Sequence, residues 1–123
     1  MIGIREFRKI AAEALSKIPE EFLEKLENVE VWVEEEPDPE MLEELGLDPR
    51  ETLFGIYQGL PRGEQSFFQA QVLPNRITLF RRPILEVCQN RDEIQEQIRK
   101  TVIHEIAHHF GFSEKRLREL GYG

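Results

Sequence analysis

The sequence has a single cysteine, no long hydrophobic run and no excess of basic residues. Cys88 is the only cysteine, so no disulfide can form within the chain. We expect Cys88 to be a buried packing residue. No apolar run approaches the roughly 20 residues that a membrane-spanning helix needs. The first residues also lack the charged start and apolar block of a signal peptide. We therefore expect a cytoplasmic protein that does not bind membranes.

Acidic residues outnumber basic ones, with 24 Asp and Glu against 16 Lys and Arg and a formal net charge of −8. Nucleic-acid-binding proteins usually present a basic face to the phosphates, so we predict no nucleic-acid partner. The chain has 123 residues, of which 40% are hydrophobic and 33% are charged. This composition predicts a single domain, residues 1–123, with one buried core. It gives no indication of the oligomeric state.

Apolar residues at three- and four-residue spacing predict amphipathic helices. Residues 4–26 follow this spacing, and Pro19 interrupts it where a second helix can begin. Asp38 followed by Pro39 is a typical helix start, and Pro83 can open another short helix. We expect the first of these segments to cover one side of a sheet.

Alternation of apolar and polar residues, with many β-branched side chains, predicts short strands. Three segments have this pattern: 29–34, 53–57 and 76–80. Residues 66–73 are ambiguous, because they fit either a strand or part of a flap. Arg81 follows the last predicted strand and, with its neighbour Arg82, predicts a solvated strand end or a binding site for a substrate carboxylate.

The longest predicted helix begins near Arg91. Asn90 and Glu93 have the spacing of a variant capping box, and Gly111 predicts the C-terminal end. Ser113 can then cap a last short helix. Six apolar residues form the predicted buried face of the long helix: Ile94, Ile98, Val102, Ile103, Ile106 and Phe110.

This helix carries an H-E-x-x-H motif, formed by His104, Glu105 and His108. Two histidines four residues apart stand one above the other on a helix face, within reach of one zinc ion. Glu105 lies next to that face, where it can take a proton from a metal-bound water. Catalytic zinc usually has three protein ligands and one water, so a third ligand is expected elsewhere in the chain.

Glu114 is the leading candidate for the third ligand. Gly111 follows His108 by three residues and can turn the chain sharply, which brings Glu114 towards the metal. The alternative is that Glu114 is an acid in the first turn of a helix, where the helix dipole favours it. Glu119 is a second candidate ligand. His109 points to another side of the helix and is expected to pack or to support the ligands.

The extended motif, H-E-x-x-H-x-x-G-x-x-E, resembles that of the metzincin zinc proteases. The chain is more similar still to the small bacterial zincin-like metallopeptidases, called minimal zincins. This resemblance covers most of residues 52–121 and rests on these segments: 104–111 with Arg116 and Leu117, 77–83, and 55–59. Two features depart from the pattern. Glu114 stands where the family usually has Asp, and both Met1 and Met41 precede the motif, whereas metzincins carry a methionine turn after it.

The resemblance implies a zincin-like α+β fold. In this fold a small mixed sheet of three to four strands packs against helices, and the motif helix lies beneath the cleft. The resemblance also implies Zn²⁺ as the cofactor, with His104, His108 and Glu114 as ligands and Glu105 as the general base.

We therefore expect a zinc-dependent metallopeptidase that cleaves a peptide or small-protein substrate. Four residues are candidates for stabilising the oxyanion: Tyr57, Arg81, Arg82 and Tyr122. The alternative is a non-catalytic zinc-binding or interaction module with the same fold. A metal-dependent nuclease is a third interpretation. Small nucleases with a three-histidine helix motif lack the glutamate at the position of Glu105, and the acidic charge also disfavours this function.

Overall fold

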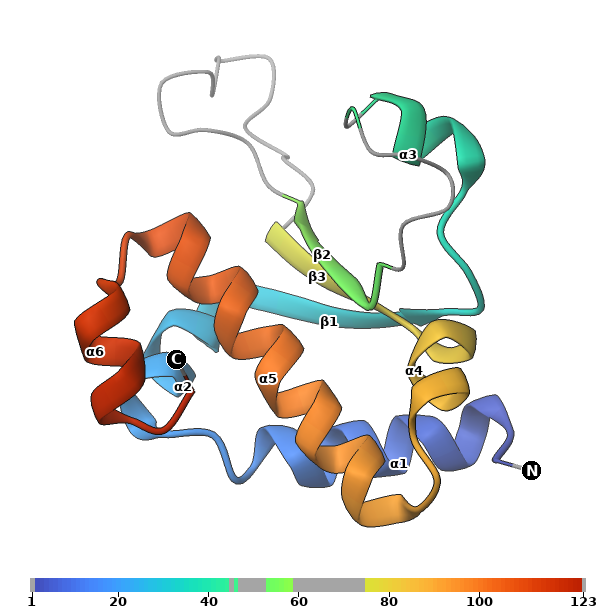
Figure 1. Ribbon diagram of the computed structural model, residues 1–123, viewed down its shortest axis with the longest axis horizontal. Helices are drawn as coiled ribbons and strands as arrows, with labels where there is room; N and C mark the ends of the chain where they lie inside the picture. Colours follow the sequence, from blue (N-terminus) through green and yellow to red (C-terminus); the bar gives the residue numbers. More distant parts are fainter. Residues whose placement is uncertain (1, 45, 47–52, 59–74, 123) are drawn as a thin grey trace.

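The computed structural model describes residues 2–44, 46, 53–58 and 75–122 (Figure 1). The chain forms both helices and strands, and the predicted α+β class is confirmed. In chain order the elements are α1 (Ile4–Leu15), α2 (Glu20–Lys25), the short 3-10 helix η1 (Leu26–Asn28), β1 (Val29–Glu34), α3 (Pro39–Glu44), β2 (Gly55–Gln58), β3 (Asn75–Phe80), α4 (Arg81–Val87), α5 (Arg91–Phe110) and α6 (Glu114–Glu119).

The three strands form one mixed sheet in the order β1-β3-β2. β1 runs parallel to the central strand β3, with Val31 opposite Ile77, and β2 runs antiparallel to it, with Ile56 opposite Thr78. All three strands were predicted from the sequence, and their observed ends differ from the predicted ones by no more than two residues. The ambiguous segment 66–73 lies outside the described residues.

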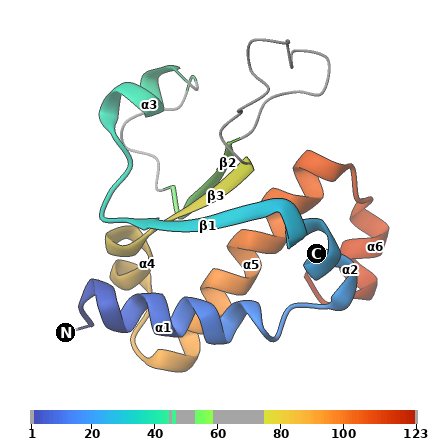
Figure 2. The same cartoon turned by 180° about the vertical axis from the view of Figure 1, so that it is seen from behind.

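The two long helices, α1 and α5, pack against each other and against one face of the sheet (Figures 1 and 2). The sheet contributes Ile77 and Leu79 from alternate positions of β3, so both side chains point to the same face. Fully burying an aliphatic side chain stabilises the fold by roughly 1.5–3 kcal/mol. The helical core residues follow the predicted spacing: Phe7, Ile10, Ala11 and Ala14 in α1, and Ile94, Ile98, Val102, Ile103, Ile106 and Ala107 in α5.

The predicted ends of α5 are confirmed. The Asn90 side chain accepts a hydrogen bond from the Glu93 backbone N–H at 2.9 Å, and the Glu93 carboxylate accepts one from the Gln89 N–H at 3.2 Å. These bonds satisfy donors that a helix N-terminus leaves unpaired. At the other end Gly111 has φ 75°, the left-handed conformation that glycine adopts at little cost.

Other details differ from the sequence prediction. The prediction of Phe110 as a core residue is wrong, because its side chain is 38% exposed and Lys25 Nζ lies 5.5 Å above its ring. Phe110 is the last residue of α5, and its ring lies edge-on to Tyr57 at 6.1 Å instead of entering the core. The first predicted helix is also shorter, since α1 ends at Leu15, and α4 begins at Arg81 rather than at Pro83.

Among the residues that the structure describes, no helix is long and apolar enough to cross a bilayer.

β2 approaches α5 closely at Gly55. A Cβ atom at this position would lie 2.7 Å from Thr101 Cγ2 and 3.0 Å from the Thr78 carbonyl oxygen. Side chains do not pack at such distances, so β2 can contact α5 here only because residue 55 has no side chain. The close contact sets the separation between β2 and the helix that carries the motif.

We predict that Gly55→Ala lowers the free energy of unfolding by about 1–3 kcal/mol, the usual cost of overpacking. Urea denaturation of the variant and the wild type measures the effect. Thr101→Ser removes the clashing Cγ2 and keeps the hydroxyl that donates to the Gln97 carbonyl, so it should restore part of the stability of Gly55→Ala. Equal stability of Gly55→Ala and wild type would contradict the prediction.

Candidate metal centre

The last two turns of α5 carry the motif residues. His104 and His108 are both exposed, whereas Ile103 and Ile106 on the opposite side of the helix are buried. Residues four apart on an α-helix lie on one face, separated by about 6 Å along the axis. The core thus fixes which face of α5 presents the two imidazoles.

The motif residues line a cavity of about 380 Å³ between α5 and the start of β2. His104, Glu105 and His108 therefore share one cavity, as the sequence predicted for a site that must admit a substrate. Its other lining residues are Leu53, Phe54, Gly55, Gln97, Lys100 and Thr101.

Glu105 is half-buried between the helix and β2. Burial raises the pKa of its carboxyl above the ordinary value, because loss of water disfavours the charged form. Three interactions lower the pKa of Glu105 and so oppose part of this rise. They are electrostatic attraction to His108, a hydrogen bond from the Tyr57 backbone and attraction to His104. A carboxyl group with a raised pKa is a better proton acceptor than an exposed one.

Tyr57 connects β2 to the motif helix through its ring. Its ring stacks on His109 with 3.9 Å between centroids and meets Phe110 edge-on at 6.1 Å. His109 thus packs, as expected from its position on the helix. The Tyr57 hydroxyl is buried and has no hydrogen-bond partner among the described residues, and burial raises its pKa.

The C-terminal turn contacts His104. His104 Nε2 lies 3.1 Å from the Tyr122 carbonyl oxygen. A carbonyl can only accept, so Nε2 carries the proton in this arrangement, and a metal ion bound at that nitrogen would replace the proton. The turn that places Tyr122 here was not predicted from the sequence, because no local signal marks a contact between residues 18 positions apart.

Glu114 occupies the first turn of α6 and is exposed. Ser113 caps this helix, as predicted, by accepting a hydrogen bond from the Arg116 N–H at 3.0 Å. In the part of the chain that the structure describes, no three His, Cys, Asp or Glu residues lie close enough to hold a metal ion, so Glu114 is not gathered with the two histidines. Glu119, the other candidate ligand, pairs with Arg116 at 3.1 Å.

The donor set at the cavity fits zinc in its chemistry. Neutral imidazole is a common zinc ligand, and two exposed imidazoles on one helix face form half of a tetrahedral site. The residues of the H-E-x-x-H motif therefore suit the metal, and the third ligand stays a prediction.

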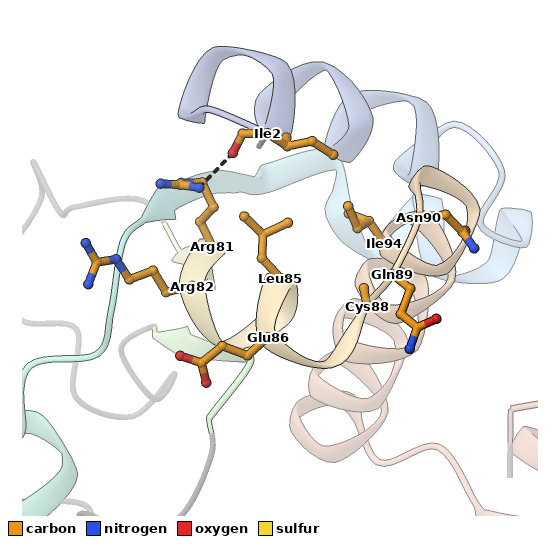
Figure 3. Close-up of a pocket in the computed structure, with 9 residues that line it drawn as sticks. All are labelled: Ile2, Arg81, Arg82, Leu85, Glu86, Cys88, Gln89, Asn90 and Ile94. Carbon is orange, nitrogen blue, oxygen red and sulfur yellow. Dashed lines mark hydrogen bonds between the residues drawn. The ribbon is translucent and has the colours of Figure 1, made fainter.

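A larger cavity of about 500 Å³ lies at the N-terminal end of α5, beside α4 (Figure 3). Cys88 lines it, half-buried against the core, and its thiol contacts the Glu93 carbonyl at 3.4 Å. Burial and the Glu93 charge raise the pKa of this thiol, which makes it a poor nucleophile. The other lining residues are Ile2, Arg81, Arg82, Leu85, Glu86, Gln89, Asn90 and Ile94. This cavity does not include the motif residues.

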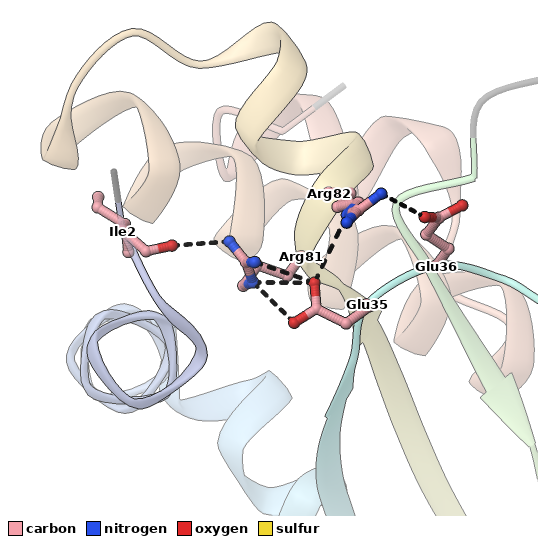
Figure 4. Close-up of polar contacts among 5 residues, drawn as sticks. All are labelled: Ile2, Glu35, Glu36, Arg81 and Arg82. Atoms are coloured by element: carbon pink, nitrogen blue, oxygen red, sulfur yellow. Dashed lines mark hydrogen bonds and ion pairs between the residues drawn. The ribbon is translucent and has the colours of Figure 1, made fainter.

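Arg81 and Arg82 are engaged away from the motif cavity (Figure 4). Arg81 Nε lies 3.1 Å from both carboxylate oxygens of Glu35, and Nη1 donates to the Ile2 carbonyl at 2.7 Å. Arg82 pairs with Glu36 at 2.9 Å. Neither arginine lines the cavity of His104. Of the four candidate oxyanion stabilisers, Tyr57 and Tyr122 are therefore the two that lie beside the motif.

Comparison with known proteins finds structural relatives and a matching family. A conserved hypothetical protein from Thermo thermophilus has a similar structure, with a TM-score of 0.57 and 25% identity over 89% of this chain and 94% of that chain. No curated protein matches the sequence. The family model of the zincin-like metallopeptidases matches residues 26–123, and the chain therefore belongs to this family.

Proposed function

We propose that the protein is a zinc-dependent metallopeptidase that hydrolyses peptide bonds. The observation that carries this proposal is the shared cavity of His104, Glu105 and His108 between α5 and β2. Membership of the zincin-like metallopeptidase family supports the same reaction class.

His104 and His108 would hold the zinc ion, with Glu114 as the third ligand. When bound, zinc supplies a Lewis acid that polarises the scissile carbonyl and lowers the pKa of water. Glu114 would have to approach the histidines when the metal binds, because the structure does not group it with them.

Glu105 would act as the general base. Its carboxylate takes the proton of the attacking water and then donates it to the leaving amine. The burial that raises its pKa suits both steps, because the group must accept a proton and release it within one turnover.

Among the described strands β2 lies at the edge of the sheet, and the side of β2 that faces away from β3 would bind the substrate backbone. Phe80 N–H donates to the Phe54 carbonyl at 2.9 Å, and in an antiparallel pair the bonded residues alternate with residues that face away. Gly55 and Tyr57 therefore turn their backbone N–H and C=O groups from β3 towards the side of Glu105. An extended peptide can pair with such an edge as an additional strand.

A non-catalytic zinc-binding module is the second candidate function. The separation of Glu114 from the two histidines favours it, because a catalytic zinc site needs three protein ligands and the described residues bring only two together. Metal affinity and turnover, measured on the same variants, separate the two functions.

We predict that the wild-type protein binds one zinc ion and that His104→Ala or His108→Ala abolishes binding. Glu114→Ala should weaken zinc affinity by more than the roughly 10–100-fold that loss of a supporting residue costs. Competition with a chromogenic chelator measures these affinities. Glu119→Ala is the matched control, and loss of zinc from this variant instead would identify Glu119 as the third ligand.

We predict that Glu105→Gln lowers kcat/KM on a peptide library by about 10²–10⁴-fold, the usual contribution of a general base. Zinc content should stay at the wild-type level, because glutamine removes the base and keeps the shape of the side chain. The control is Glu24→Gln, an exposed residue of α2 with the same change in charge. A Glu105→Gln protein with full activity would disprove the mechanism.

Glu105 also makes the stability of the metal-free protein depend on pH. Burial raises its pKa in the folded state, so the folded protein holds this proton more tightly than the unfolded chain. Below the unfolded value of about 4.3 the carboxyl is neutral in both states and burial costs no charge. As the pH rises through the folded pKa, the charged form appears and stability is lost.

We therefore predict that metal-free Glu105→Gln is more stable than metal-free wild type at about pH 8 and that the difference narrows as the pH falls towards about 4. Urea denaturation in the presence of a chelator at several pH values tests this. A difference that does not change with pH would show that Glu105 is not desolvated.

A further inference from the structure

The motif cavity extends along α5 for one turn before His104. Gln97, Lys100 and Thr101 line this part, opposite the apolar residues Leu53 and Phe54 that lead into β2. The cavity therefore has a polar wall from the helix and an apolar wall from the strand. Such a mixed lining can bind the apolar part of a ligand and orient its polar end.

Lys100 supplies the positive charge of this part of the cavity. It is exposed, and no ion pair joins it to another residue in the described ranges. Glu96, one turn earlier, is the natural helical partner for a lysine at this spacing, but Glu96 pairs with Arg99 instead. Within the part of the chain that the structure describes, the ammonium group of Lys100 is therefore available to a ligand in the cavity.

Gln97 and Thr101 stabilise the wall around Lys100. The Gln97 side-chain amide donates to Thr101 Oγ1 at 3.2 Å, and that hydroxyl donates to the Gln97 carbonyl at 2.7 Å. The amide nitrogen of Gln97 has a second N–H, which can donate to a ligand in the cavity. An ammonium and an amide donor on one wall are suited to a carboxylate.

We propose that Lys100, with Gln97, forms a subsite that binds a carboxylate of the substrate one or two residues from the cleaved bond. The carboxylate is an Asp or Glu side chain or the C-terminus of a peptide. This inference rests on the proposed function, because it places the subsite relative to the motif. Lys100 lies about 6 Å along the helix from His104, and an extended peptide advances about 3.3 Å per residue, which gives the spacing of one or two residues.

The net charge of the protein works against this preference. With a formal charge of −8 the molecule as a whole repels acidic peptides and attracts basic ones. A preference for a carboxylate would therefore have to come from a local positive group, and Lys100 is the one lysine or arginine among the described residues that line the cavity.

The test uses peptides with blocked ends that carry Glu, Gln or Lys at one defined position and mixed residues elsewhere. A fourth set has neutral side chains and a free C-terminal carboxylate, which separates the two sources of the charge. Zinc-loaded wild type gives the rates of cleavage. Fluorescence anisotropy with labelled peptides and the Glu105→Gln protein gives the affinities without turnover.

We expect the Glu peptides, the free-carboxylate peptides or both to bind and to be cleaved about fivefold better than the Gln peptides, the upper range for one exposed ion pair. Lys100→Gln should remove this preference, and Lys100→Glu should transfer it to the Lys peptides. Lys100→Arg should keep it. The matched control is Lys9→Glu, an exposed residue of α1 that makes the same change in net charge.

Three outcomes would overturn the subsite. Cleavage of all peptide sets at equal rates would reject the subsite and leave the peptidase function intact. An equal loss of preference in Lys9→Glu and Lys100→Glu would assign the effect to net charge. A protein that neither binds nor cuts any of the peptides would reject the subsite and the peptidase together.

Discussion

The packing of α5 is the constraint on which the rest of the molecule depends. Side chains on a helix follow one another at about 100°, so residues that are fixed in the core also fix the direction of their neighbours. Ile103 and Ile106 are completely buried, and this holds His104 and His108 outwards. A rotation of α5 by one residue would expose these isoleucines, each at a cost of roughly 1.5–3 kcal/mol, and would move polar imidazoles into the core.

β2 adds the second half of the site because it lies so close to α5. Gly55 permits the contact with Thr101, and the Tyr57 ring stacks on His109. The same approach removes water from Glu105, since the strand covers the helix face next to the histidines. One packing contact therefore closes a wall of the cavity and raises the pKa of the candidate base.

Much of the fold could be predicted because its signals are local. Asn90 with Glu93 marks the start of α5, Gly111 marks its end, and alternation along 29–34 locates β1. The strand order and the parallel pairing of β1 with β3 could not be predicted, because they depend on contacts between residues about 46 positions apart. Phe110 was misplaced for a related reason: it continues the apolar spacing, but the spacing does not show that the last turn of α5 is partly exposed.

The arrangement of the site residues could also be predicted only in part. The H-E-x-x-H spacing places His104 and His108 on one helix face by local geometry alone, and the structure brings them together at one cavity. The position of Glu114 depends on the turn between α5 and α6, which the sequence specifies only at Gly111 and Ser113. The burial of Glu105 and the presence of Lys100 in the same cavity depend on β2, which is about 45 residues earlier in the chain, so neither could be predicted from the motif.

The contact between His104 and the C-terminal turn involves Nε2, the nitrogen that would also bind a metal ion. Leu117 is buried and its carbonyl accepts from the Tyr122 N–H at 2.8 Å, so the packing of α6 determines where the Tyr122 carbonyl lies. One hydrogen bond contributes about 0.5–1.5 kcal/mol net, whereas zinc binding by a folded structural site is worth about 10–16 kcal/mol. The carbonyl therefore orients the His104 ring in the metal-free protein, and a metal ion bound at Nε2 would have to replace this hydrogen bond.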